Sequence, residues 1–305
     1  TINTWPSKKW YAAEGVKLTA LLQEAQIKGS ARLIKVKSVD GYVMTFTKKE
    51  LLDDTRYYFP NFKEGGGDGD GHIPGSPVGK EPVEAIIALR SVENSDNFGY
   101  MNELNCPLLV LGQRAVTEQT NHTFVKNVGE IEVLTDPPSK WAVPKADPPG
   151  GEVPAGTEVK LTNEFNDSDK IYYTTDGRNP TLDSPIYNWV ASRWWSQRGM
   201  DTVAKINRPI VITEDTIIKA KTIGFGREDS EIVTFTYKVI HRKPVIDEIK
   251  PGEGGKVSLG DEAAIEIPAG ALTGTGVQKV KIEPVEFPPA PPPGFKLLSD
   301  VFEFT

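Results

Sequence analysis

The feature that most constrains this chain's fold is its density of turn-forming residues, with 28 Gly and 24 Pro among 305 residues. Gly and Pro end regular elements and mark tight turns, and this chain spaces them between short runs rich in β-branched residues. The pattern predicts a mainly β, multi-domain protein with Ig-like β-sandwich modules and a small α+β domain at its N-terminal end.

Local patterns place the first elements. Apolar residues at helical spacing predict a helix over residues 18–25. Asp40-Gly41 between two alternating runs predicts a β-hairpin. The Thr47 hydroxyl could cap a second helix over residues 48–52. Further strands are expected over residues 83–90, 107–112, 129–134, 158–162, 170–174, 210–212, 216–223, 232–239, 277–285 and 295–304.

Composition shifts divide the chain into three expected domains. Residues 1–136 form an α+β domain, and prolines at 137–138 and 144–154 then predict an extended connector. Residues 137–240 form a β-sandwich with a Trp-rich insertion over 189–208. Residues 241–305 hold few strands, and we expect this β-module to be incomplete, because the sequence was cut here or because another chain supplies the rest.

Charge and cysteine content narrow the classes of function. The net charge is −7 and no long basic run occurs, which argues against nucleic acid as a partner. No stretch approaches the roughly 20 apolar residues of a membrane span. The single cysteine, Cys106, excludes an internal disulfide. Because the sequence begins at Thr1 without a leader, we expect a processed or trimmed N-terminus.

Two stretches resemble known families. The sequence WYAAEGVKLTALL at residues 10–22, with SVDGY at 38–42 and EIEV at 130–133, resembles the molybdopterin-binding domain of sulfite-oxidase-like oxidoreductases. That resemblance implies a cysteine ligand to molybdenum upstream of Trp10, where this sequence has no thiol. Cys106 is a candidate replacement, but it adjoins an apolar strand and is expected to be a small buried residue.

The sequence YTTDGRNPTLDSPIY at residues 173–187 resembles the C-terminal β-sandwich module of chitobiases and β-hexosaminidases, which implies an accessory module without catalytic residues. Asp176-Gly177 supplies its turn. Residues 255–272 resemble ZU5-type modules of surface proteins. The three histidines are far apart, and no G-x-S-x-G motif occurs, so the motifs favour a protein without an active site.

Two groups of residues are candidate binding sites. Asp68 and Asp70 lie in a Gly-rich loop and could offer oxygen ligands to Ca²⁺, although a solvated loop is the alternative; no other cofactor is expected. The second group could stack on a glycan or contact a protein, or else be buried in a core. It consists of Trp189, Arg193, Trp194 and Trp195.

These observations favour a non-enzymatic structural protein of a bacterial cell surface. We expect it to be secreted and to form a filament or surface layer from identical copies, with a strand of one copy completing a sheet of the next. One alternative is a molybdopterin-dependent oxidoreductase subunit or fragment whose ligand lies upstream. The other is a carbohydrate-binding protein with cell-wall glycan as its partner.

Overall fold

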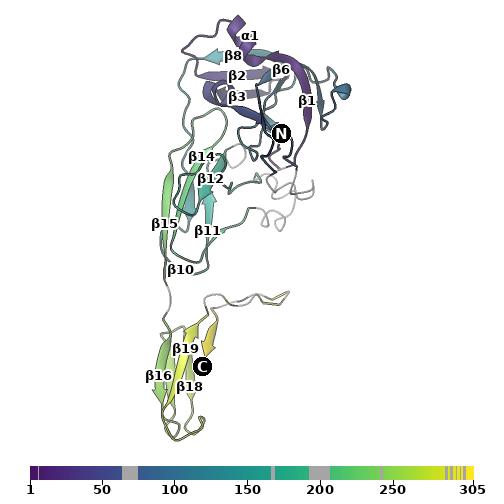
Figure 1. Cartoon of the computed structure of the whole chain (residues 1–305). Helices are drawn as coiled ribbons and strands as arrows, with labels where there is room; N and C mark the ends of the chain where they lie inside the picture. Colours follow the sequence, from purple (N-terminus) through teal and green to yellow (C-terminus); the bar gives the residue numbers. More distant parts are fainter. Residues whose placement is uncertain are drawn as a thin grey trace. The chain divides into compact units, whose positions relative to one another are not determined.

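The computed structural model describes residues 1–5, 7–63, 75–165, 169–191, 207–240, 243–285, 288, 291–292, 294–295, 297 and 300–305. The chain is mainly β, as predicted. Figure 1 draws its strands as arrows, coloured from the N-terminus to the C-terminus. It divides into two compact units. Unit 1 comprises Thr1–Pro149, Lys160–Pro209 and Ile217–Phe235, and unit 2 comprises Gly150–Val159, Ile210–Thr216 and Thr236–Thr305.

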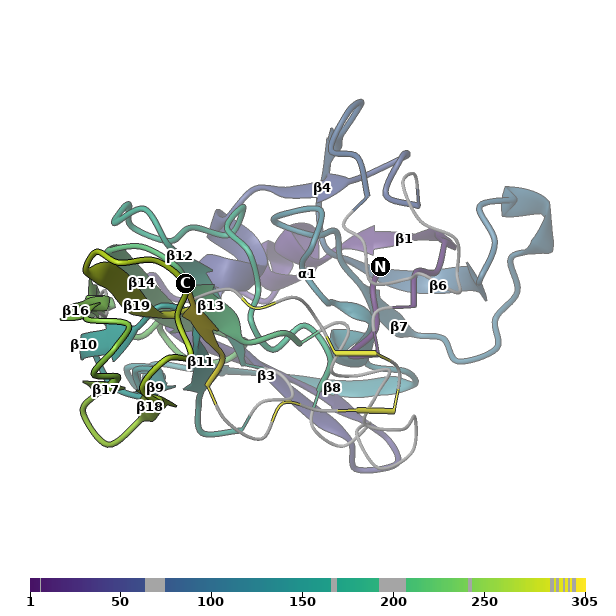
Figure 2. The same ribbon diagram turned by 90° about the horizontal axis from the view of Figure 1, so that it is seen from below.

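Two three-stranded sheets and a hairpin build the first part of unit 1. One sheet has the order β1-β6-β7, and the other has the order β3-β2-β8. In Figure 2 β1 lies beside β6, with which it pairs antiparallel. The elements are β1 (Tyr11–Lys17), α1 (Leu18–Glu24), β2 (Leu33–Ser38), β3 (Val43–Thr47), η1 (Lys49–Asp53), β4 (Arg56–Tyr58), β5 (Glu81–Val83), β6 (Ile86–Glu93), η3 (Phe98–Tyr100), β7 (Leu108–Val110), η4 (Asn121–Thr123) and β8 (Val128–Leu134).

Several local predictions are confirmed in this part. The helix α1 covers nearly all of the predicted range, and the hairpin of β2 and β3 turns at Gly41, whose φ is +92°. The predicted cap at Thr47 is a reciprocal capping box, in which the Glu50 amide donates to Thr47 Oγ1 and the Thr47 amide donates to a Glu50 carboxylate oxygen. The helix that follows, η1, is a π-helix.

One large core fills this part of unit 1. It is built from α1, β2, β3, β6 and β7 and includes the fully buried side chains of Leu18, Ile34 and Phe46. The partly buried Cys106 packs against this core, with its Sγ 3.6 Å from Ser91 Oγ. Its environment is therefore that of a small apolar residue beside a strand.

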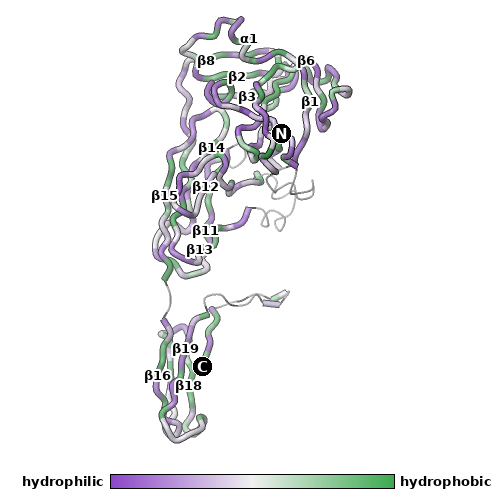
Figure 3. Tube along the Cα trace, in the orientation of Figure 1, coloured by the Kyte–Doolittle hydropathy of each residue, from purple (hydrophilic) through white to green (hydrophobic). Residues whose placement is uncertain are grey.

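The middle of the chain forms two further sheets with the orders β10-β15-β14-β12 and β13-β11-β9. Along β15 burial alternates, and Tyr237 and Val239 are buried while their neighbours are exposed. Figure 3 colours β15 and the rest of the chain by hydropathy. The strands are β9 (Lys145–Asp147), β10 (Gly151–Pro154), β11 (Thr157–Thr162), β12 (Lys170–Thr174), β13 (Ile210–Ile212), β14 (Thr216–Ile223) and β15 (Val233–Ile240).

The predicted turn at Asp176-Gly177 is present, with Gly177 at a φ of +76°. The chain then returns, so that Ile186 pairs with Tyr172 in a single antiparallel bridge. The partner of β12 along its whole length is instead β14, from Lys170 opposite Ile223 to Thr174 opposite Lys219.

The last residues of unit 2 form a three-stranded sheet, β16-β19-β20, and a two-stranded hairpin, β17-β18. Both contribute to one small core that contains Ile249, Val257 and Ile282. The strands are β16 (Val245–Ile249), β17 (Gly255–Leu259), β18 (Ala263–Ile267), β19 (Gln278–Pro284) and β20 (Phe302–Phe304).

Candidate functional site

Unit 1 contains a cavity of about 930 Å³. Its lining includes the apolar residues Ala85, Ile86, Val110 and Leu111, together with charged residues from several elements and loops. A cavity of this size can hold a small organic ligand. The lining contains eight aromatic side chains, which are Trp10, Tyr11, Tyr57, Tyr58, Phe59, Phe62, Phe98 and Phe124.

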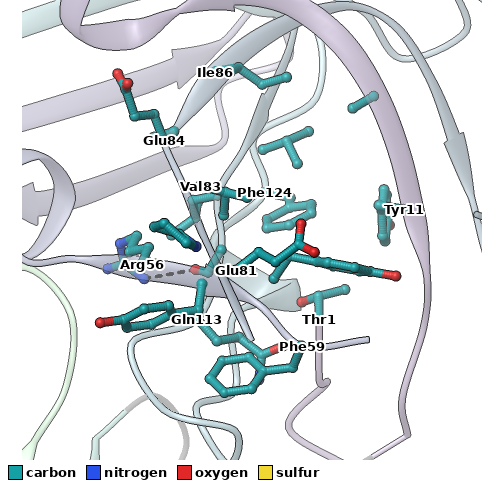
Figure 4. Close-up of a pocket in the computed structure, with 18 of the residues that line it drawn as sticks. Thr1, Tyr11, Arg56, Phe59, Glu81, Val83, Glu84, Ile86, Gln113 and Phe124 are labelled. Atoms are coloured by element: carbon teal, nitrogen blue, oxygen red, sulfur yellow. Dashed lines mark hydrogen bonds between the residues drawn. The ribbon is translucent and has the colours of Figure 1, made fainter. Parts of the chain in front are cut away.

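The hairpin of β4 and β5 positions one side of this cavity. Its register places Tyr58 opposite Glu81 and Arg56 opposite Val83. Side chains directly opposite each other in an antiparallel pair lie on the same face of the hairpin, so Tyr58 and Glu81 are neighbours. Figure 4 shows Glu81 between Arg56 and Tyr11, while Glu84 points away from the other labelled residues.

A buried ion-pair network supports the wall behind β4. The Arg56 guanidinium, whose side chain is 2% exposed, donates to Glu118 at 3.1 Å and to backbone carbonyl oxygens of Glu50 and Gly112. Arg114 Nε donates to the other oxygen of Glu118 at 2.8 Å, and Arg114 Nη1 donates to Asp54 at 3.1 Å. Burial alone would raise the pKa of Glu118, but the charges of Arg114 and Arg56 hold that pKa below its usual value.

Glu50 ties a loop of the middle segment to the same network. The Gly226 amide donates to its carboxylate at 2.6 Å, and the adjacent Phe225 ring lies under the guanidinium groups of Arg56 and Arg114 at 5.8 and 5.7 Å. Burial raises the pKa of Glu50 to about 7, although hydrogen bonds from backbone amides and the charge of Arg114 act in the opposite direction. The network therefore fixes the middle segment's loop against the first sheets of unit 1.

The cations that line the cavity already have partners. Lys9 pairs with Glu93, Lys17 pairs with Glu84, and Arg56 belongs to the buried network. Five carboxylates line the same cavity: Asp53, Asp54, Glu81, Glu84 and Asp96. This lining does not suit an anion, because a phosphate group needs free guanidinium, ammonium or amide donors.

The molybdopterin cofactor that the first resemblance implies does not fit this lining. No cysteine lines the cavity, and Cys106 packs instead against the core and Ser91. Arg114 is committed to Glu118 and Asp54, so it cannot serve the cofactor's phosphate without breaking buried ion pairs. The thiolate and phosphate donors that such a cofactor requires are not gathered here.

Of the residues predicted to bind a ligand or partner, Trp189 is the one that the structure describes. It is 5% exposed and packs with Ile2, Phe59, Phe62 and Val190 in a small core of unit 1. A ring enclosed in this way presents little surface to a partner. The other members of the two predicted groups lie outside the described residues: Asp68, Asp70, Arg193, Trp194 and Trp195.

Within the described residues, no group of three or more His, Cys, Asp or Glu side chains is placed to hold a metal ion. The predicted Ca²⁺ loop is outside that range and stays a prediction. Among the helices that the structure describes, none has the length and apolar character of a membrane span.

The middle sheets belong to a segment that matches a known family of β-sandwich modules. Residues 148–234 match the family model of the chitobiase/beta-hexosaminidase C-terminal domain, which confirms the resemblance of this segment. No curated protein matches the chain. The oxidoreductase-like resemblance of residues 1–134 and the ZU5-type resemblance of residues 255–272 stay predictions.

The cavity and its ion-pair network were not predicted from the sequence. Arg114 and Glu118 are four residues apart, which is a visible signal, but the third member, Arg56, is 62 residues from Glu118. Tyr58 and Glu81 are brought together by a hairpin whose two strands have only three residues each. Strands this short leave no periodic signal in a sequence.

Proposed function

We propose that this protein is a non-enzymatic structural protein of a bacterial cell surface that assembles with copies of itself by strand addition. The observation that carries the proposal is the set of open sheet edges in unit 2. In a sheet with the order β16-β19-β20, both β16 and β20 are edge strands, and the hairpin β17-β18 has two edges of its own.

Edge strand β16 is the best acceptor among these. It has five residues, pairs with β19 along its whole length, and is hydrogen-bonded to no second strand among the residues that the structure describes. Ile246 on this strand is 55% exposed. An edge with unpaired amide and carbonyl groups and an exposed apolar side chain is a template for a strand from another chain.

Two further observations support a structural role. The family model that matches residues 148–234 describes the C-terminal domain of chitobiases and β-hexosaminidases and gives no indication of catalysis in this chain. In unit 1 the buried charges of Arg56 and Glu118 pair with one another at 3.1 Å. Two buried charges that pair in this way compensate each other within the folded unit.

The proposal is tested by placing a charge on the edge. Lysine on an edge strand opposes pairing with another chain, so Ile246→Lys should abolish or strongly reduce polymers seen by negative-stain microscopy and sedimentation velocity. The matched control is Leu89→Lys, because Leu89 is 53% exposed but lies on β6, between β1 and β7.

We expect the control variant to assemble like the parent protein. A parent protein that stays monomeric at high concentration would contradict the proposal, as would equal assembly of both variants. Stoichiometric molybdenum in the intact protein would instead favour the oxidoreductase alternative.

A further inference from the structure

The residues that line the cavity belong to unit 1, whereas β16 belongs to unit 2, and the lining combines aromatic rings with charged groups. At its rim the Tyr58 side chain is 40% exposed. Trp10 lies beside it with the ring centroids 6.0 Å apart, and Phe62 packs edge-on against Trp10 at 4.5 Å. Phe62 is buried, so it holds Trp10 in place and leaves Tyr58 as a ring that a ligand can reach.

Two carboxylates stand near that ring without a cation of their own. Within the described residues, neither Glu81 nor Asp96 forms an ion pair, whereas Asp53, Asp54 and Glu84 each pair with a lysine. Burial, followed by the charges of Asp96 and Glu81, raises the pKa of the Tyr58 hydroxyl. Glu81 is the residue opposite Tyr58 in the pair of β4 and β5, and Asp96 lines the same cavity as both of them.

The charges and rings restrict the class of ligand. The unpaired carboxylates would repel an anion. An entirely apolar ligand would displace water from the carboxylates without replacing the lost hydrogen bonds. For a ligand cation, two rings of the lining are already faced by ammonium groups of the chain itself, because Lys80 Nζ lies 4.3 Å from the Tyr57 ring and Lys63 Nζ lies 5.8 Å from the Trp10 ring. A neutral polyhydroxyl ligand meets none of these objections.

We propose that this cavity binds a neutral oligosaccharide, which stacks a sugar ring on Tyr58 and donates hydroxyl hydrogen bonds to Glu81 and Asp96. Carboxylate oxygens accept several hydrogen bonds, and the C–H face of a sugar ring packs on an aromatic ring. The volume of about 930 Å³ allows more than one sugar ring. The site lies wholly in unit 1, so the test of ligand binding is independent of the test of assembly at β16.

Isothermal titration calorimetry of the whole chain tests the site, with N-acetylchitotriose and cellotriose as neutral probes and with putrescine and inorganic phosphate as charged ones. We expect at least one neutral probe to bind, Tyr58→Ala to weaken it at least tenfold, and Glu81→Gln to weaken it severalfold. The matched controls are Tyr100→Ala, whose ring is 65% exposed outside the cavity, and Glu24→Gln on α1. Both controls should bind like the parent.

Three results would overturn the proposal. The first is that neither neutral probe binds to the parent protein. The second is that Tyr58→Ala and Glu81→Gln bind as tightly as their controls. The third is that putrescine or phosphate displaces the sugar with higher affinity, which would make the cavity a site for a charged ligand. All four substituted side chains are exposed or lie at the rim, so folding of the variants is not at risk.

Discussion

At the scale of single residues, the most consequential side chain is the Glu118 carboxylate, which is shared by Arg56 and Arg114. Glu118→Ala leaves two buried guanidinium groups without this partner, and we expect a loss of about 3–5 kcal/mol in the free energy of unfolding. Urea unfolding of unit 1 measures it. The control is Glu130→Ala, which removes an exposed partner of Lys37 and should cost less than about 1 kcal/mol. Equal losses would mean that the buried network is not a major source of stability.

Glu50 gives unit 1 a pH dependence. Burial raises its pKa in the folded protein from the ordinary value of 4.5 to about 7, so the folded state holds this proton more tightly than the unfolded state does. The contribution of Glu50 to stability is therefore complete below pH 4.5 and is lost as the pH rises to about 7.

Glu50→Gln removes this titration and keeps a side-chain oxygen to accept from Thr47 and Gly226. Unfolding measured from pH 4.5 to 8 should show the variant gaining stability relative to the parent as the pH rises, up to roughly 3 kcal/mol. A stability difference that does not change with pH would contradict the assigned pKa. The raised pKa of Glu50 could not be predicted from the sequence, because Glu50 is buried partly by a loop 176 residues away.

At the scale of elements, the loop at Phe225–Gly226 joins the middle segment to the first sheets. Gly226 has a φ of +78°, and a Cβ added there would lie 2.7 Å from the Thr45 carbonyl oxygen. We expect Gly226→Ala to lose at least about 2 kcal/mol more than Gly41→Ala does. Gly41 is the matched control, since its φ of +92° imposes similar strain but its added Cβ meets nothing within 4 Å. Similar unfolding midpoints for the two variants would contradict this account.

The elements that the sequence predicted well are those with strong local signals. Asp40-Gly41, the Thr47 cap and the alternating residues of β14 and β15 each specify their structure within a few positions. The strand β1 was not expected, because its sequence YAAEGVK has no regular alternation. Its pairing with β6 shifts register between Glu14 and Gly15, and a Cβ on Gly15 would lie 2.1 Å from the Ile87 carbonyl oxygen. That close approach is a property of the pair of strands, which one segment cannot reveal.

At the scale of the whole molecule, local pattern predicted the class of fold but not the site. The mainly β architecture follows from turn residues and alternation, and the Tyr-Thr-Thr-Asp-Gly segment identified the module that the family match confirms. The cavity instead requires Trp10, Tyr58, Glu81 and Phe124, which come from four separate elements or loops. Tertiary packing brings these residues together, so no regular spacing in the sequence predicts the cavity.

The central claim is that copies of this protein join at the edge strand β16, and hydrogen exchange tests it at the strand itself. Those amides of Val245–Ile249 that point away from β19 should become protected when the protein concentration is raised into the range where polymers form, because a strand from a second copy would then accept their hydrogen bonds. The central strand β6 should exchange at the same rate at every concentration. Exchange of the β16 amides that does not change with assembly, or the absence of any assembly, would contradict the account.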